Sequence, residues 1–481
     1  MYLSIYVSYC LTLVLLCSCQ VNNTSGGERK LPAPQIEALF PRGLKVTVPD
    51  FGFTIVTFHG NVNKTIRDIE IGSLTLCDVQ TPNDTENRAW VLRDNNVKLN
   101  LGDTLYYWIS VHNKKRVSRR TYPTEYEIFE YSYEDQSYSI TSSDPTDTCP
   151  VQDCEASETV VQGSKSVCKG QLIFDEKFGR NKHGLSNWHA EVMFPEGPDF
   201  PSNVYMEAET ISLENGNLVI KPLLLEDYYH EGILYEELDL SKICTGRLET
   251  TECSRRASGA NILPPVVTGK VTTRQTFNFK YGRIEVCAKL PAGSWLVPEI
   301  NLEPRDNIYG NGRYASGLMR IAFARGNPNM TTSLYAGPVL YSKEPFRSAL
   351  IKEKIGQEDW HKEYHNYTLV WRKDGIHLHV DCEEYGHIEP GTFFQLAESS
   401  GVQHADRWLS GTNMAPLDEL FYLSLGLRVG GANDFPDGGA NKPYQNGERR
   451  AMLNFWEHRD AWLPTWTDSS LKVHYVKVYA L

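Results

Sequence analysis

The stretch that decides the fold runs from Tyr281 to Trp295 and reads YGRIEVCAKLPAGSW. Its first ten residues complete a run, from Thr276 to Leu290, that we predict to be a β-strand. Comparable runs lie on both sides of it, whereas the 3.6-residue periodicity of helices is nearly absent. Many short strands over about 310 residues, from Cys168 onward, predict a large antiparallel sandwich or jelly roll. The other runs are Leu218 to Pro222, Leu318 to Phe323, Asn366 to Trp371, Ile376 to Val380, Phe421 to Leu427 and Leu471 to Val478.

A smaller set of strand-like runs precedes this region. Between Leu31 and about Ile128, short β-rich runs alternate with turn signals, which predicts a small immunoglobulin-like β-sandwich of about 100 residues. From Thr121 to Ser164 the sequence holds no Lys or Arg and is rich in acidic residues, Ser and Thr, which is typical of a linker. We therefore predict an all-β protein with a signal segment at 1–19, the sandwich at 31–128, an acidic linker at 129–167 and the jelly roll at 168–481.

The N-terminal segment favours export. Residues 1–19 carry no charged side chain, contain an apolar stretch from Leu11 to Cys17 and end in small residues, as a secretory signal peptide does. No later segment approaches the roughly 20 apolar residues that a membrane span requires. We expect a secreted, extracellular protein with no membrane span.

Eight cysteines follow the signal segment, and an even number on an exported chain favours disulfides. We predict a bond between Cys244 and Cys253, which close a short polar loop, and local pairing among Cys149, Cys154 and Cys168. No Cys-x-x-Cys pair supports zinc, so we expect no metal site and no cofactor. Whether a structural calcium is held stays open.

Charge and sequons narrow the ligand class. The formal net charge of −12 argues against nucleic acid, because phosphate backbones are bound through basic surface. Neutral polymers fit better. Asn-x-Ser/Thr sequons occur at Asn22 and Asn23 and at the four positions where we predict glycosylation, Asn63, Asn83, Asn329 and Asn366.

Several blocks of the second domain resemble the laminarinase-type glycoside hydrolases of family 16. They include GQLIF from Gly170, NGNLVI from Asn215, YGRIEV from Tyr281, LPAGSW from Leu290 and the closing LKVHYV from Leu471. The resemblance implies a concave jelly roll whose catalytic carboxylates follow the pattern Glu-x-Asp-x-x-Glu on one strand. A retaining glycosidase needs two such carboxyl groups about 5–5.5 Å apart.

That pattern is replaced in this chain. The corresponding block reads LMRIAF, so Leu318 stands at the nucleophile, Arg320 at the tuning Asp and Phe323 at the acid/base. Leu and Phe do not ionise and Arg keeps its proton, so none can perform these steps. Glu299 and Glu303 are alternative carboxylates, but four residues of strand span about 13 Å, too far for either type of site. We predict no glycosidase activity; a cleft lined by Trp295 and Arg320 could still hold a glucan.

The whole combination, from Leu31 to Leu481, resembles the insect β-1,3-glucan recognition proteins, also called Gram-negative bacteria binding proteins. The resemblance implies a haemolymph pattern-recognition receptor of innate immunity. Such a receptor binds microbial polysaccharide (β-1,3-glucan, lipopolysaccharide or other wall polymers) and triggers an extracellular serine-protease cascade of the Toll or prophenoloxidase type.

The N-terminal sandwich resembles the glucan-binding module of these proteins. Carried over by position, Asp78 matches the last acid of a family stretch Asp-Trp-x-Arg-Asp, Trp108 its strand tryptophan and Arg119 its hairpin arginine. The chain departs from that stretch: SLTLCD, from Ser73, lacks the first Asp, the Trp and the Arg. Trp108 has two interpretations, core or sugar platform. The basic cluster Lys114, Lys115, Arg116, Arg119 and Arg120 is a solvated hairpin, a contact for anionic polymers or a docking site for the acidic linker.

Two alternative functions remain. One is an active endo-β-1,3-glucanase with a rearranged site, which would release reducing sugar from laminarin. The other is an extracellular structural or adhesive glycoprotein, which would show no saturable glucan binding. A non-catalytic microbial-polysaccharide receptor is the prediction that the sequence favours.

Overall fold

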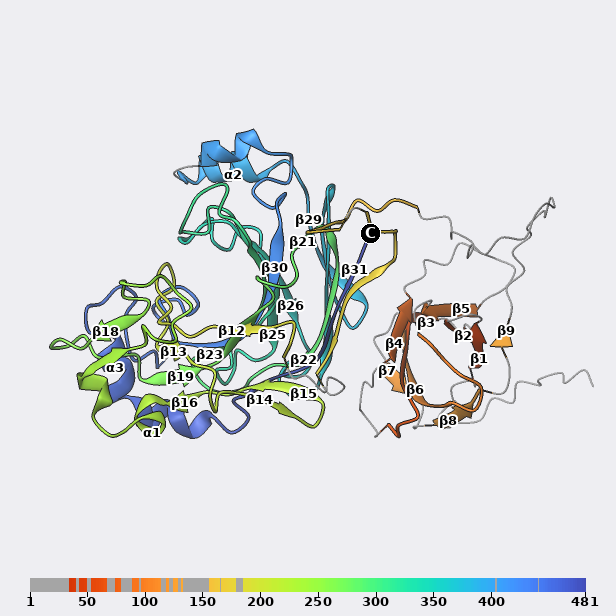
Figure 1. The fold of residues 1–481 in the computed structure, drawn as a ribbon, viewed down its shortest axis with the longest axis horizontal. Helices are drawn as coiled ribbons and strands as arrows, with labels where there is room; N and C mark the ends of the chain where they lie inside the picture. Colours follow the sequence, from red (N-terminus) through yellow and green to blue (C-terminus); the bar gives the residue numbers. More distant parts are fainter. Residues whose placement is uncertain are drawn as a thin grey trace, which may run out of the picture.

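The computed structural model describes residues 34–39, 43–49, 53–66, 74–78, 89–94, 97–113, 118–120, 124–128, 131–132, 155–164, 166–178, 185–402, 405–439 and 441–481. Within them the protein is built mainly from β-strands, with few and short helices (Figure 1). The all-β prediction is confirmed. The predicted signal segment at 1–19 lies outside the described residues.

Two sheets form the N-terminal region, as a sandwich requires. The first has the order β5-β2-β1-β9, and the second the order β4-β3-β6-β7, with β8 also paired to β6. Buried side chains from both sheets, including Val46, Phe58, Trp90 and Ile109, form one core cluster. The strands are β1 (Gln35–Leu39), β2 (Leu44–Pro49), β3 (Phe53–Val62), β4 (Leu74–Asp78), β5 (Ala89–Asp94), β6 (Thr104–Asn113), β7 (Ser118–Arg120), β8 (Thr124–Glu127) and β9 (Tyr131–Ser132).

A nine-stranded sheet forms one layer of the C-terminal region. Its main order is β10-β21-β30-β23-β24-β25-β26, while β20 pairs with β30 and with β12. Strand β30 is buried at every position, so both of its faces are covered. The strands are β10 (Val160–Val161), β12 (His189–Ala190), β20 (Lys270–Thr272), β21 (Phe279–Lys280), β23 (Leu296–Pro304), β24 (Leu318–Phe323), β25 (Ser333–Val339), β26 (Lys352–Ile355) and β30 (Phe421–Val429).

An eight-stranded sheet forms the second layer, in the order β14-β15-β31-β22-β27-β28-β29 with β11 paired to β31. Side chains from both layers, such as Trp371 of this sheet and Phe421 of the other, pack into one large core cluster. The strands are β11 (Leu172–Lys177), β14 (Ile211–Glu214), β15 (Asn217–Ile220), β22 (Gly282–Lys289), β27 (His365–Arg372), β28 (Gly375–Val380), β29 (Glu383–Ile388) and β31 (Leu471–Tyr479).

Smaller elements complete this region. A three-stranded sheet has the order β13-β19-β16, and β17 pairs with β18. No helix in the described part of the chain is long and apolar enough to cross a membrane. The elements are β13 (Asn203–Tyr205), β16 (Leu223–Leu224), β17 (Glu237–Asp239), β18 (Ser254–Arg256), β19 (Val266–Thr268), α1 (Leu225–Tyr228), α2 (Phe393–Ser399), α3 (Ala451–Glu457), α4 (Arg459–Trp462) and the 3-10 turns η1 (Ile233–Tyr235), η2 (Ala405–Ser410) and η3 (Leu463–Thr465).

The stretch at the centre of the fold is shorter than predicted, beginning at Phe279 and ending at Lys289, and it is interrupted once. The run expected as a single strand from Thr276 to Leu290 is divided into β21 and β22 at Tyr281. Tyr281 has a φ of 59°, in the left-handed region that a continuing strand does not use. Its ring is buried at 5.2 Å from that of Trp371, and this tertiary contact accompanies the break.

The cysteines follow the sequence prediction in part. Cys244 and Cys253 form a disulfide. Cys168 is also disulfide-bonded, while Cys149 and Cys154 lie outside the described residues. Cys287 is a free thiol buried in β22 beside Tyr475, so the even cysteine count does not translate into complete pairing.

Candidate functional site

Strand β24 presents Leu318, Arg320 and Phe323, the three residues predicted to stand at catalytic positions, on one face. Arg320 lies opposite Gly337 of β25 and Phe323 opposite Tyr335, with a bulge between the two pairs. Without the bulge, residues 320 and 323 would point to opposite faces, because side chains alternate along a strand. The bulge therefore brings Arg320 and Phe323 into the same pocket.

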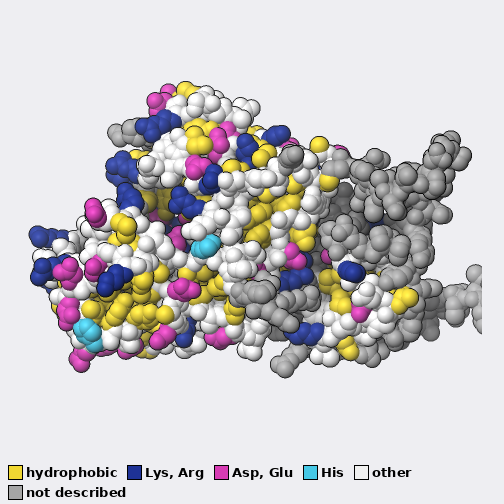
Figure 2. Space-filling model, in the orientation of Figure 1, with side chains coloured by type: hydrophobic (Ala, Val, Ile, Leu, Met, Phe, Trp, Pro, Cys, Tyr) yellow, Lys and Arg dark blue, Asp and Glu magenta, His cyan; other side chains and the backbone are white. Residues whose placement is uncertain are grey.

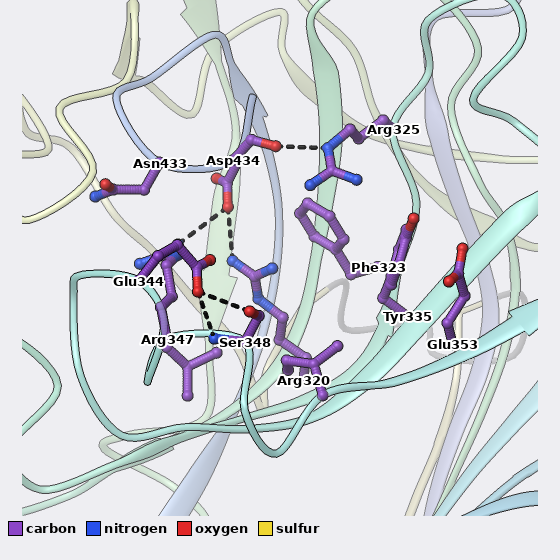
Figure 3. A pocket seen from close by; sticks show the side chains of 12 residues that line it. Arg320, Phe323, Arg325, Tyr335, Glu344, Arg347, Ser348, Glu353, Asn433 and Asp434 are labelled. Atoms are coloured by element: carbon purple, nitrogen blue, oxygen red, sulfur yellow. Dashed lines mark hydrogen bonds and ion pairs between the residues drawn. The ribbon is translucent and has the colours of Figure 1, made fainter. Parts of the chain in front are cut away.

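This pocket encloses about 190 Å³. Figure 3 shows Arg320, Phe323, Arg325 and Tyr335 converging on it from β24, β25 and the segment after β24. Arg320, Phe323, Arg347 and Asp434 are buried, whereas Glu344, Ser348 and Glu353 are exposed. The lining residues are Arg320, Phe323, Arg325, Tyr335, Val339, Glu344, Arg347, Ser348, Ile351, Glu353, Asn433 and Asp434.

Three arginines and two aspartates form a buried network at the pocket's inner end. Asp434 contacts Arg320 at 2.7 Å, Arg347 at 3.1 Å and Arg428 at 2.5 Å. Asp199 contacts Arg347 at 2.9 Å and Arg428 at 2.7 Å. Every side chain is at most 11% exposed, so each charge depends on its partners rather than on water. The network fixes Arg320 in place.

The network also sets the protonation of its carboxylates. Burial opposes their ionisation, but Arg428 and Arg347 hold the pKa of Asp199 well below its ordinary value. Burial also opposes the ionisation of Asp434, but Arg428 and Arg320 outweigh it and lower the pKa of Asp434. Both aspartates are therefore anionic at neutral pH and serve as counter-ions to the arginines.

Aromatic faces and guanidinium groups alternate along one wall of the pocket. The guanidinium carbon of Arg320 lies 4.0 Å from the centre of the Phe323 ring. That of Arg325 lies 5.6 Å from Phe323 and 5.2 Å from the half-buried Tyr335. The Arg325 Nε atom donates to the backbone oxygen of Asp434 at 2.5 Å, which orients its fork. A ring face beside guanidinium donors suits a pyranose, whose apolar side stacks while its hydroxyls accept hydrogen bonds.

Two further carboxylates of this sheet, Glu299 and Glu303 of β23, are paired. Glu299 accepts a hydrogen bond from Tyr205 at 2.6 Å and lies 3.5 Å from Arg428. Glu303 lies 3.0 Å from Lys270 and accepts from the Tyr422 hydroxyl at 3.0 Å. Lys270 and Tyr422 together hold Glu303 as an anion, and its pKa is lowered although burial opposes this.

Trp295 does not line this pocket. It is 7% exposed and packs against Phe435 at 5.1 Å and Tyr444 at 6.2 Å. Gly293 and Trp295 both have positive φ, 143° and 70°. The PAGSW turn that they form directs the Trp295 indole into the core. The cleft expected from Trp295 and Arg320 is therefore built from Arg320 with Phe323, Arg325 and Tyr335. Figure 2 shows a recess in the surface of the C-terminal region, with Lys and Arg side chains at its margin.

In the N-terminal sandwich, Trp108 lies on the outer face of its sheet. Its neighbours Tyr107 and Ile109 point into the core between the sheets, so alternation places Trp108 on the other side. Its ring stacks on His59 at 4.2 Å. Trp108 is 8% exposed and His59 9%, so this face is covered rather than open.

The comparisons with known proteins cover almost the whole chain. A family model described as a carbohydrate binding domain (family 32) matches residues 30–140. Beta-1,3-glucan-binding protein 2 of Manduca sexta is 46% identical, over 95% of this chain and 96% of that protein. Beta-1,3-glucan-binding protein 1 of Galleria mellonella is 42% identical over 94% and 96%. Gram-negative bacteria-binding protein 3 of Drosophila melanogaster is 34% identical over 94% and 95%.

The chain belongs to this family of insect β-1,3-glucan-binding and Gram-negative bacteria-binding proteins. The resemblance stated from the sequence is confirmed. Among solved structures, the laminarinase catalytic domain of Thermotoga maritima matches 65% of this chain and 99% of that chain, at 18% identity and a TM-score of 0.43. The family relatives are named as binding proteins, while this structure is named as a laminarinase.

The other site residues carried over from the glucan-binding family fall at the limits of the described structure. Asp78 ends β4 and Arg119 lies in β7, but their side chains are outside the described residues, as are Lys114, Lys115 and Arg116. Their roles stay predictions. Sequence reasoning missed Arg347 and Asp434, because they lie in loops and nothing in the local sequence marks them as partners of β24.

Proposed function

We propose that this protein is a secreted receptor that binds microbial polysaccharide of the β-1,3-glucan class without hydrolysing it. Two regions serve this function: the N-terminal module and the C-terminal pocket. The proposal extends to a place in immune signalling, in which the bound receptor triggers an extracellular serine-protease cascade. Family membership supports the ligand class, since relatives over almost the whole length are named for binding β-1,3-glucan or Gram-negative bacteria.

The observation that carries the non-catalytic part is the composition of the β24 face. Arg320 and Phe323 line the pocket, and Leu318 shares their face. A retaining mechanism needs one group that attacks the anomeric carbon and another that donates a proton. Neither Leu nor Phe can do either, and Arg320 is committed to Asp434.

The two carboxylates considered from the sequence, Glu299 and Glu303, do not favour a substitute catalytic pair. Glu299 and Glu303 are each engaged by a buried cation and a tyrosine hydroxyl. A general acid needs a raised pKa, whereas Lys270 and Tyr422 help to lower that of Glu303. The arrangement favours holding a sugar over cleaving one.

The test uses the full-length protein in pull-downs against curdlan and laminarin, with reducing sugar assayed in the same tubes. We expect saturable binding and no sugar release above a protein-free blank. Release that rises with protein concentration would restore the glucanase alternative, and absence of saturable binding would favour a structural role.

A variant locates the contribution of the pocket. Tyr335→Ala removes an aromatic face next to Arg325, and we expect affinity for soluble laminari-oligosaccharide to fall about three- to ten-fold. Tyr385→Ala is the matched control, since Tyr385 is equally half-buried but lies on β29 of the other sheet. Equal affinities for the two variants in calorimetric titration would remove the pocket from the proposal.

We further propose that glycans occupy Asn63 and Asn329, which are exposed, and leave Asn366 unmodified. Asn366 is 5% exposed in β27, and its amide nitrogen donates to the Tyr475 hydroxyl at 3.2 Å. Burial, rather than this hydrogen bond, counts against the sequence prediction for Asn366, because the exposed Asn63 amide also donates a hydrogen bond, to Asp103 at 2.7 Å. Asn83 lies outside the described residues and stays a prediction. Glycopeptide mass spectrometry of protein secreted from insect cells should find residue 366 unmodified; a glycan there would refute the assignment.

A further inference from the structure

The turn between β28 and β29 contains an unusual cysteine. Only Asp381 and Cys382 separate the two strands, and both have positive φ, 49° and 69°. Two-residue hairpin turns of this kind favour Asn-Gly or Asp-Gly, because a β-carbon is disfavoured at positive φ. Cys382 occupies the glycine position, and it is disulfide-bonded. A bond to another part of the chain explains a cysteine at such a site.

The other cysteines narrow the choice of partner. Cys244 is paired with Cys253, and Cys287 is a free buried thiol. Ala156 forms an isolated β-bridge with Cys168, which brings the chain two residues after Cys154 beside that cysteine. Local pairing of Cys154 with Cys168 then leaves Cys77 and Cys149 for Cys382.

The N-terminal sheet places residue 77 on its covered outer face. In the pairing of β3 with β4, Thr57 lies opposite Cys77 and His59 opposite Thr75. Directly opposed residues share a face, so residue 77 is on the face of Thr57, His59 and Trp108. Thr57 is 4% exposed, so something packs over this part of the sheet.

The C-terminal region lies next to that face. The pKa of Asp381 is lowered: burial opposes this, but His365 and, more weakly, His59 favour the carboxylate. His59 therefore lies near the residue that precedes Cys382. Burial raises the pKa of Tyr479 in β31, and Asp94 of β5 adds a smaller electrostatic contribution, so these two strands also lie near each other. Figure 1 shows β3, β4 and β7 on the side of the sandwich that faces β22 and β31.

We propose that a disulfide between Cys77 and Cys382 fastens the outer face of the N-terminal sheet to the β28–β29 turn. The bond forms when two thiols give up two protons and two electrons to an oxidised protein disulfide of the export route, by thiol–disulfide exchange. The link holds the Trp108 face against the C-terminal region.

The sequence offers a sharp test, because Cys77 is the only cysteine between residues 20 and 148. A protease site inserted between residues 133 and 147 of the full-length protein separates residue 77 from every later cysteine. After cleavage without reductant, we expect both fragments to migrate as one species in denaturing gels and to separate when dithiothreitol is added. Fragments that separate without reductant would overturn the proposal. This is the result expected if Cys382 were bonded to Cys149, because both cysteines would then lie on the same fragment.

Variants identify the second cysteine. Cys382→Gly removes the thiol and suits the turn, so the cleaved protein should separate without reductant while remaining folded by circular dichroism. Cys287→Ser is the matched control and should leave the fragments joined. Fragments of Cys382→Gly that stay joined until reduction would overturn the assignment of Cys382. None of these outcomes depends on glucan binding, so the proposed function is tested separately.

Discussion

Replacing Asp434 by Ala is expected to lower the free energy of unfolding of the C-terminal region by about 3–5 kcal/mol. Asp434 is 1% exposed and forms ion pairs with Arg320, Arg347 and Arg428. Removing it leaves three buried guanidinium groups with Asp199 and Glu299 as the nearby anions. The cost arises from uncompensated buried charge, which exceeds what the intact ion pairs contribute.

Equilibrium urea unfolding followed by tryptophan fluorescence measures this loss. Asp306→Ala is the matched control, because Asp306 also pairs with an arginine, Arg305 at 3.1 Å, but is 57% exposed. Exposed pairs contribute little, so the control should unfold close to the wild type. If the two variants unfolded at the same urea concentration, the buried network would not carry the stability assigned to it.

Lys270→Met is expected to cost a similar amount, about 3–5 kcal/mol, and the loss should depend on pH. Lys270 is 10% exposed and lies 3.3 Å from Glu191 and 3.0 Å from Glu303. Burial disfavours its charge, but Glu191 and Glu303 raise the pKa of Lys270 well above its ordinary value. Without this cation, Glu191, whose pKa burial already raises, and Glu303 lose their counter-charge.

The sign of the pH dependence follows from these carboxylates. In the variant their folded-state pKa values lie above the unfolded ones, so stability is lost as pH rises through the folded pKa. The difference from the wild type should therefore be larger at pH 8 than at pH 5, where Glu191 and Glu303 take up protons. Lys362→Met, in an exposed pair with Glu358, is the control and should show little change at either pH. A pH-independent loss would point to packing rather than charge.

Much of the strand pattern was predictable because it is local. The runs from Asn366 to Trp371 and from Phe421 to Leu427 lie within β27 and β30, and Leu318 to Phe323 became β24 with the predicted bounds. Periodic burial leaves a mark on consecutive residues, which is why such segments are readable. The division at Tyr281 was not predictable, since it accompanies the contact of that ring with Trp371, 90 residues later in the chain.

The candidate site was predictable in its chemistry but only partly in its shape. Leu318, Arg320 and Phe323 cannot act as a nucleophile or an acid, and this follows from side-chain identity alone. The sequence did not indicate that Trp295 packs in the core rather than in the cleft, because a tryptophan after a turn suits either environment. The aromatic wall instead includes Tyr335, which the register of β25 sets opposite Phe323.

The sequence by itself determined the all-β architecture and the family, because both follow from local pattern and residue identity. Only the tertiary structure decided which charges meet. Asp199 and Arg428 lie 229 residues apart, yet they are joined at 2.7 Å. Such a contact depends on how two sheets and their loops close around a core, and a buried charge network is stable only when that closure brings all its members together.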